Sequence, residues 1–435
     1  MLDLIIKNGS CYIDRDLKDQ DIAIKDAKIV KIGNIEEEAK EIFDAKGLTV
    51  LPGCIDTQTH FREPGSTDTE DLNSGSKAAI VGGITSVFEM PNTNPPTSSK
   101  KEFQRKLDLA KNRMYCNYAF YFGATADNAK ELRDLENLDG CCGIKLFAGS
   151  STGNLLVADE KDIETVFQNS SKVVAVHSED EEILNINKKL IKNGDVHSHP
   201  IWRSEECAIS STRRIVRIAE RYKKKAHVLH ITTKQEIDFL SQHKGNISFE
   251  ITPQHLTIYA PDCYDKLGTY AQMNPPLREK SHYDRLWYAV KNNLNDTIGS
   301  DHAPHLKENK KKKYPNSPSG MPGVQTLMPV MLNHINDGKL SLEQLMNSLC
   351  ENPVKIFGIK NKGFIKKGFD ADFTIVDMNK KIIIKNENIE SKCGWSPFDG
   401  YEFKGTPVST IVAGKIKMKE GKIIGNPEGT ALLFN

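Results

Sequence analysis

Eight short segments rich in apolar and β-branched residues recur through the middle of the chain, and each ends in polar residues. They are Cys54–His60, Thr85–Met90, Tyr115–Phe122, Gly143–Phe147, Lys172–His177, Ala226–Thr232, Ile247–Thr252 and Thr297–Asp301. Helical patterns lie between most of them, and strands that alternate with helices form parallel βαβ units. Eight such units over about 250 residues predict a (β/α)8 barrel of the TIM type. The alternative, a doubly wound open sheet, lacks a Gly-x-Gly-x-x-Gly motif after the first segment.

The two ends of the 435-residue chain show a different pattern, with short alternating strands separated by turn-forming residues. Asp21–Ile24 near the start and Asp372–Val376 near the end are examples. Such ends fit either two separate caps or one sheet built from both termini. We predict the second arrangement, an α/β protein in which residues 1–50 and 361–435 form a small composite β-domain beside a barrel of residues 51–360.

Charge and composition exclude several classes of function. The chain has 59 Lys and Arg against 58 Asp and Glu, a net charge of +1, which leaves no excess for binding nucleic acid or anionic membranes. It contains no apolar run of the roughly 18 residues that cross a membrane, and its first residues do not resemble a secretory signal. Its nine cysteines are scattered without a Cys-x-x-Cys pair, which predicts free thiols in a reducing, cytoplasmic compartment.

Polar side chains suited to catalysis follow five of the eight predicted strands. In a parallel barrel the active site lies at the carboxyl ends of the strands, so these side chains are expected to meet at one face. They are Gln58, His60 and Arg62 after the first strand, Lys145 after the fourth, His177 after the fifth, His230 after the sixth and Asp301 after the eighth. Clustered polar groups need partners, and a metal ion supplies them. Imidazole and carboxylate are the ligands of hydrolytic zinc sites, so the sequence predicts a Zn²⁺ centre.

Lys145 is unusual in such a cluster, because an ammonium group repels a metal ion. Carboxylation of its amine by CO₂ would give an anionic carbamate whose oxygens can bridge two metal ions. A buried salt bridge is the alternative role for this lysine, and the residues alone leave both roles open.

Several motifs occur in order across nearly the whole chain. They include Pro-Gly-Cys-Ile-Asp-Thr-Gln-Thr-His-Phe-Arg-Glu-Pro-Gly at 52–65, Met-Pro-Asn-Thr-Asn-Pro at 90–95, Ile-Lys-Leu-Phe at 144–147, Val-His-Ser-Glu at 176–179, Asn-Pro-Pro-Leu-Arg at 274–278 and Ser-Asp-His-Ala-Pro-His at 300–305. Each motif is weak alone, whereas the ordered set is specific. The set resembles the dihydroorotases, a group of cyclic amidohydrolases within the amidohydrolase superfamily.

The resemblance implies metal-binding roles for the residues at the strand ends. His60 and Asp301 would bind a first metal ion. His177 and His230 would bind a second, and Lys145, as a carbamate, would bridge the two. Asp301 would also act as the catalytic base and then as the acid that protonates the leaving nitrogen.

The same resemblance implies a site for an anionic substrate. Arg62, Asn92 and His305 would hold its carboxylate, since a guanidinium fork matches a carboxylate and the other two side chains donate hydrogen bonds. Asn274 would approach the ring amide. The implied reaction is the reversible cyclisation of N-carbamoyl-L-aspartate to L-dihydroorotate in pyrimidine biosynthesis, by attack of a metal-bound hydroxide on the cyclic amide. The implied protein partners are a second copy in a homodimer and aspartate transcarbamoylase.

Gln58 departs from the family pattern, whose opening motif is His-x-His. The first site could bind metal weakly, glutamine could ligate through its carbonyl oxygen, or the chain could be a non-catalytic scaffold for aspartate transcarbamoylase. Because the other implied residues are all present, we expect an active enzyme. Allantoinase and dihydropyrimidinase activities are alternatives that share the metal ligands, whereas Arg62 and His305 favour a substrate with a free carboxylate.

Overall fold

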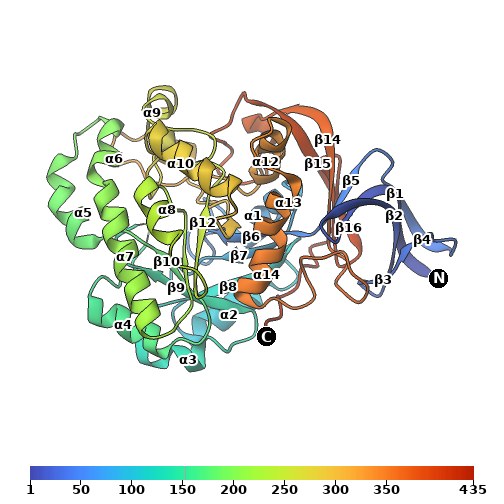
Figure 1. Ribbon diagram of the computed structural model, residues 1–435, viewed down its shortest axis with the longest axis horizontal. Helices are drawn as coiled ribbons and strands as arrows, with labels where there is room; N and C mark the ends of the chain where they lie inside the picture. Colours follow the sequence, from blue (N-terminus) through green and yellow to red (C-terminus); the bar gives the residue numbers. More distant parts are fainter. Residues whose placement is uncertain (152) are drawn as a thin grey trace.

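The computed structural model describes residues 1–151 and 153–435, and within these ranges its centre is a barrel of eight parallel strands (Figure 1). The strands are β6 (Cys54–Thr59), β7 (Ile84–Glu89), β8 (Asn117–Gly123), β9 (Cys141–Phe147), β10 (Val174–His177), β11 (Ala226–Val228), β12 (Ile247–Ile251) and β13 (Thr297–Ile298). Neighbours in the sheet follow the order of the chain. A parallel bridge between Thr59 and His302, just beyond β13, brings the last strand back to the first. The predicted barrel is confirmed, and each predicted segment supplies one strand.

Helices surround this barrel (Figure 1). They are α1 (Leu72–Val81), α2 (Lys100–Ala110), α3 (Leu132–Leu135), α4 (Glu160–Asn169), α5 (Glu181–Asn187), α6 (His199–Trp202), α7 (Glu205–Arg221), α8 (Lys234–Leu240), α9 (Asp262–Leu267), α10 (Lys280–Lys291), α11 (Lys307–Lys310), α12 (Leu327–Asn336), α13 (Leu342–Met346) and α14 (Asn352–Phe357). In α7, Ser204 caps the first turn by accepting a hydrogen bond from the Cys207 backbone. Its buried residues, such as Ile215, Ile218 and Ala219, recur at helical spacing and face the barrel.

A second sheet is built from both ends of the chain, as predicted. In the described ranges it has nine strands: β1 (Leu2–Ile13), β2 (Asp16–Lys25), β3 (Lys28–Gly33), β4 (Ala39–Asp44), β5 (Thr49–Pro52), β14 (Phe373–Ile383), β15 (Glu402–Val412), β16 (Lys415–Lys419) and β17 (Lys422–Ile423). The short strand β5 joins the two halves, because it pairs with β1 on one side and with β14 on the other. Apolar residues from both ends, including Ile24 and Ile375, share one core.

The last residues of the chain leave this sheet and return to the barrel (Figure 1). Tyr118, near the start of β8, donates its backbone N–H to Thr430 and accepts one from Leu432. Ile359 pairs with Phe434 in the same region. This end of the barrel lies opposite the carboxyl ends of the strands, so the carboxyl-terminal tail closes the barrel floor and leaves the other end free.

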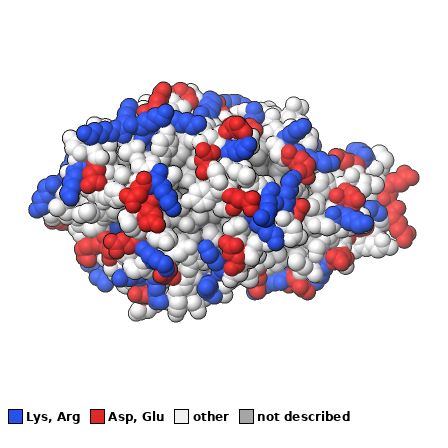
Figure 2. Space-filling view, turned by 90° about the horizontal axis from the view of Figure 1, so that it is seen from above, with Lys and Arg blue, Asp and Glu red and all other residues white. Residues whose placement is uncertain are grey.

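The distribution of charge on the surface and the state of the cysteines match what the composition of the chain predicts. Figure 2 shows acidic and basic side chains interspersed over the face that is viewed, as a net charge of +1 would suggest. The nine cysteines are all free thiols and all buried. In the part of the chain that the structure describes, no helix is long and apolar enough to cross a membrane.

Candidate active site

The carboxyl ends of the barrel strands surround one small buried cavity. Nine of the ten residues singled out from the sequence line it: Gln58, His60, Arg62, Asn92, Lys145, His177, His230, Asn274 and Asp301. The tenth, His305, lines an outer cavity that shares Arg62 and Asn92 with the inner one. The structure therefore brings all the candidate residues together, although they come from points as far apart as 58 and 305 in the chain.

His60 and Asp301 form the first pair of facing donor atoms. His60 Nε2 lies 3.2 Å from Asp301 Oδ1, and His60 Nδ1 lies 2.9 Å from Asn92 Oδ1. Because the amide oxygen only accepts, Nδ1 carries the proton and the lone pair on Nε2 faces the carboxylate. Gln58 Nε2 donates to the same Asp301 oxygen at 3.0 Å. Two acceptors that face each other in a buried site need a shared proton or a cation between them.

His177 and His230 form the second pair. His177 Nδ1 lies 3.1 Å from His230 Nε2, while His177 Nε2 lies 2.8 Å from Glu179 Oε2. The carboxylate fixes the proton of His177 on Nε2 and turns the lone pair of Nδ1 towards His230. Burial lowers the pKa of both imidazoles, so both are neutral at pH 7.

Burial shifts the pKa values of Lys145 and Asp301 in opposite directions. Burial lowers the pKa of the Lys145 amine to about 7, although Asp301 and Glu250 oppose the shift. Burial likewise raises the pKa of the Asp301 carboxyl to about 7, against the attraction of Lys145. Near neutral pH a large fraction of Lys145 is therefore the neutral amine, which is the form that reacts with CO₂.

Three of the site residues adopt left-handed backbone conformations. The φ angles are 63° at Arg62, 40° at His230 and 42° at Asp301. Side chains other than glycine rarely adopt such angles, which cost on the order of 1–3 kcal/mol. Each of these residues lies two or three residues beyond the end of a barrel strand, and each side chain lines the inner cavity.

The contacts of Arg62 and His305 define the substrate side of the site. Arg62 Nε and Nη2 donate to the Pro304 carbonyl at 3.2 and 3.1 Å. His305 Nε2 lies 2.9 Å from the Ser319 carbonyl and 3.4 Å from Arg62 Nη2, so the shorter contact assigns its proton to Nε2. Burial lowers the pKa of Arg62 to about 10, which leaves the guanidinium charged at neutral pH.

Asn274 is oriented by a neighbouring histidine. His199 Nε2 lies 3.0 Å from the Met273 carbonyl and 3.1 Å from Asn274 Oδ1, and both are acceptors. The Asn274 carboxamide oxygen is therefore occupied. Its Nδ2 points to Ser151 Oγ, at 3.4 Å, on the wall of the cavity. The site presents an amide donor, not an acceptor, at this position.

The distances within the two pairs suit a bound metal ion. The separations of 3.1 and 3.2 Å match the roughly 3.0–3.4 Å between two ligands that lie about 2.0–2.1 Å from one zinc ion. Among the described residues, Gln58 Oε1 and His230 Nδ1 are buried without hydrogen-bond partners. Both pairs fit, whereas Gln58 presents its amide nitrogen to Asp301. No group of three or more His, Cys, Asp or Glu side chains placed to hold a metal occurs in the described chain. Positions 58 and 145 carry an amide and an amine.

Two other histidines of the barrel have structural contacts. His227 is buried between Ser248 and Thr297, at 2.8 and 3.1 Å, inside the barrel. His255 contacts Thr252 Oγ1 at 2.7 Å and the Pro275 carbonyl at 3.3 Å.

Sequence reasoning missed several residues of the site. Those that line the inner cavity are Phe147, Ser151, Ala303, Ser319 and Gly320. Glu179, which orients His177, was also missed. Its position two residues after His177 in the chain could have revealed it, because residues two apart in an extended segment point the same way.

Comparison with known sequences gives consistent relatives. The sequence model of the Amidohydrolase family matches residues 49–417. A dihydroorotase from Pyrococcus furiosus is 35% identical, over 99% of this chain and 96% of its own length. A dihydroorotase from Methanosarcina acetivorans is 34% identical, over 98% of this chain and 94% of its own.

Comparison with solved structures agrees on the fold. The L-hydantoinase (dihydropyrimidinase) from Arthrobacter aurescens superposes with a TM-score of 0.94 at 30% identity and covers 99% of both chains. The dihydropyrimidinase from Brevibacillus agri superposes with a TM-score of 0.91 at 27% identity, over 99% of this chain and 98% of its own. The chain therefore belongs to the amidohydrolase family and is one of its metal-dependent cyclic amide hydrolases.

Proposed function

We propose that the protein is a dihydroorotase, which interconverts N-carbamoyl-L-aspartate and L-dihydroorotate. The observation that carries the proposal is the charged, buried Arg62 on the wall shared by the inner and outer cavities. A buried guanidinium needs an anionic partner, and the carboxylate of dihydroorotate would supply it. Dihydrouracil, hydantoin and allantoin carry no carboxylate. The dihydroorotase names of the relatives support the same substrate.

The substrate would lie between two sets of residues. Arg62, with Asn92 and His305 beside it, would bind the carboxylate from the outer side. Asn274 would donate its Nδ2 hydrogen to a ring carbonyl, since His199 occupies its oxygen. This arrangement would hold the scissile amide next to Asp301, which is the positional contribution to the rate.

Asp301 would move the proton in the reaction. In ring opening, water adds to the amide carbonyl carbon while the Asp301 carboxylate accepts a proton from that water. The carbon–nitrogen bond then breaks, and Asp301 returns the proton to the leaving nitrogen. Cyclisation follows the same steps in reverse. A carboxyl with a pKa of about 7 is suited to both directions.

The metal-binding residues would be His177 and His230 on one side and His60 and Asp301 on the other. We propose zinc as the metal, one or two ions per chain, and a carboxylated Lys145 as the bridge. A bound zinc ion would polarise the amide carbonyl and make water more acidic. Carboxylation forms an N–C bond between the neutral Lys145 amine and CO₂ and releases one proton.

The cellular setting is part of the same proposal. Nine buried free thiols are compatible with a reducing compartment, and we propose the cytoplasm. We also propose pyrimidine biosynthesis as the pathway, a homodimer as the assembly, and aspartate transcarbamoylase as a candidate partner.

A dihydropyrimidinase activity is the alternative, and the names of two solved structures similar to this chain support it. This activity would use the same metal ligands, but its substrate has no carboxylate for Arg62 to bind.

The decisive experiment follows the loss of L-dihydroorotate absorbance by the purified protein supplied with zinc and bicarbonate. Dihydrouracil and allantoin are tested in parallel, and Asp301→Ala is the control. Turnover of dihydroorotate that disappears in the control would support the proposal. A folded, zinc-loaded protein that does not turn over dihydroorotate would overturn it.

A further inference from the structure

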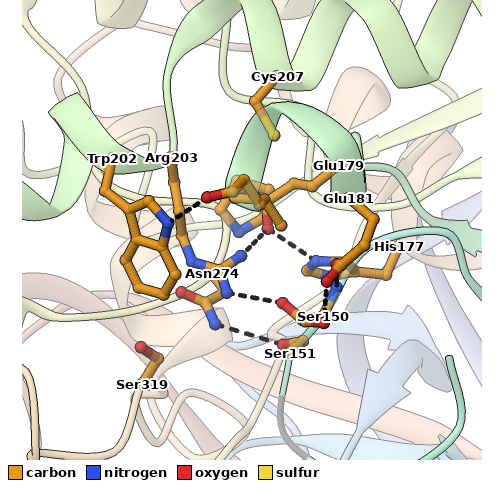
Figure 3. A network of polar contacts seen from close by, with 12 residues as sticks. Ser150, Ser151, His177, Glu179, Glu181, Trp202, Arg203, Cys207, Asn274 and Ser319 are labelled. Carbon is orange, nitrogen blue, oxygen red and sulfur yellow. Dashed lines mark hydrogen bonds and ion pairs between the residues drawn. The ribbon is translucent and has the colours of Figure 1, made fainter. Parts of the chain in front are cut away.

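A buried arginine outside the cavity connects two parts of the site (Figure 3). Arg203 directly follows α6 and is 3% exposed. Its Nη1 donates to Glu179 Oε2, and its Nη2 donates to the Ser150 carbonyl at 2.6 Å. The Trp202 ring lies 4.7 Å from the guanidinium carbon. The two arms of one guanidinium thus reach two different segments of the chain.

The first arm acts on His177. Glu179 Oε2 accepts from Arg203 and lies 2.8 Å from His177 Nε2, so a single oxygen joins the guanidinium and the imidazole. Glu179 Oε2 therefore accepts hydrogen bonds from two sides. A carboxylate oxygen held by a guanidinium acts as an acceptor, which keeps the proton of His177 on Nε2 and the lone pair of Nδ1 towards His230.

The second arm acts on the loop after β9. Ser150, whose carbonyl Arg203 binds, also donates its backbone N–H and its hydroxyl to Glu181 at 2.6 and 2.8 Å. The next residue, Ser151, lines the inner cavity and contacts Asn274. Figure 3 shows Ser151 facing Asn274, and Ser150 in contact with both Arg203 and Glu181.

The backbone of Arg203 is held as well. Its carbonyl accepts from Arg278 Nη1 at 3.0 Å, and the adjacent Ser204 carbonyl accepts from Nη2 at 3.4 Å. Arg278 also donates to Thr232 Oγ1, at 2.9 Å, just beyond β11. Arg203 is therefore fixed to the barrel independently of the two segments that it positions.

We infer that Arg203 is a positioning residue that links metal binding to substrate binding. Through Glu179 it holds His177 in the one tautomer and orientation that can bind a metal ion, and through Ser150 it holds the loop that forms the wall opposite Asn274. The substrate half of this inference rests on the proposed function, whereas the metal half does not. Glu179 and Arg203 touch neither cavity, so neither is assigned a catalytic role.

The competing explanation is that Arg203 and Glu179 are only a structural ion pair. A matched control exists in the composite β-domain, where Lys362 is 9% exposed and pairs with Asp372 at 2.6 Å. Both Lys362→Met and Arg203→Met remove a buried cation. The first cation lies at a distance from the site, and the second lies beside it. Both changes are expected to lower the melting temperature, and only Arg203→Met is expected to change His177.

The test measures the full-length protein in two ways. Zinc affinity is determined by dialysis against zinc buffers, and the tautomer of His177 is read from ¹⁵N chemical shifts of the imidazole in metal-free protein. Arg203→Met is expected to bind zinc about 10- to 100-fold more weakly and to show a mixture of tautomers. Lys362→Met is expected to match the wild type in both readouts.

A second variant keeps the inference testable if Arg203→Met does not fold. The double variant Glu179→Gln with Arg203→Met leaves no unpaired buried charge and is judged by the same two readouts. Wild-type zinc affinity with a single His177 tautomer in the folded variant would overturn the inference. Equal losses in Lys362→Met would also overturn it. The assays do not use dihydroorotate, so failure of the proposed function would be seen separately as absent turnover in the wild type.

Discussion

Replacing Gln58 by histidine is expected to strengthen metal binding at the position between His60 and Asp301. In the native protein Gln58 Nε2 donates to Asp301 Oδ1 at 3.0 Å, and His60 Nε2 faces the same oxygen at 3.2 Å. A metal ion that binds Asp301 there must compete with the amide donor. An imidazole at position 58 would remove that donor and add a nitrogen ligand.

The size of the effect follows from the hydrogen bond that is lost. A hydrogen bond to a charged group contributes about 1.5–3 kcal/mol, and each 1.4 kcal/mol is about tenfold in a binding constant. Removal of the competing donor should therefore strengthen metal binding by about 10- to 100-fold, before the new ligand is counted. The effect should be largest above pH 7, because the Asp301 carboxyl, with a pKa of about 7, is then ionised.

The assay is equilibrium dialysis against zinc buffers at pH 8, followed by elemental analysis of the protein. The native protein is expected to retain one zinc ion tightly, and Gln58→His two. Gln58→Ala is the matched control, since it removes the amide donor without adding a ligand and should show the smaller part of the gain. Equal affinity of all three proteins for the second ion would refute the reasoning.

Three further changes probe the rest of the site. Asp301→Asn should reduce dihydroorotate turnover by about 10²- to 10⁴-fold in a folded protein, because the amide cannot accept the proton; a loss below tenfold would contradict this role. Arg62→Met should raise KM for dihydroorotate by about 10- to 100-fold through the lost charged contact, as steady-state kinetics would show, and an unchanged KM would count against the carboxylate clamp. Glu179 should lower the free energy of unfolding as pH drops from 4.5 towards 2, by roughly 3 kcal/mol at most from this group. Its pKa is lowered from 4.5 to about 2 in the folded protein, so over this range the unfolded chain binds a proton there more readily than the folded protein. Urea unfolding should show that the free energy of unfolding of Glu179→Gln changes less with pH over this range than that of the wild type.

The barrel and its ligand positions were predictable because both follow from local periodicity. An apolar segment that ends in a polar residue is visible in the sequence, and a parallel barrel places all such ends at one face. His60, Lys145 and His177 were found in this way, and the structure places all three on one cavity.

The loops around the cavity were not predictable on the same grounds. Ser151 and Ser319 lie in segments without periodicity, and their place in the cavity depends on contacts with distant parts of the chain. The four-residue helix α6 (His199–Trp202) is too short to give a helical pattern, although it carries His199 and leads to Arg203. The left-handed turn at His230 likewise gives no signal in the sequence, because only a small fraction of histidines adopt this backbone conformation.

The energetics of the site bear on the alternative that the chain is a non-catalytic scaffold. Lys145 and Asp301 are 1% and 5% exposed, and in the described structure His230 Nδ1 is buried without a hydrogen-bond partner. A buried polar atom without a partner costs about 1–3 kcal/mol, and the left-handed backbone at His230 and Asp301 costs a similar amount at each position. A scaffold gains nothing from these costs, because apolar residues of similar volume would fill the same space with greater stability. Departures from the rules of stable packing are expected where chemistry needs them. Those at His230 and Asp301 lie on a proposed ligand and on the proposed base, so the site favours an active enzyme in spite of Gln58.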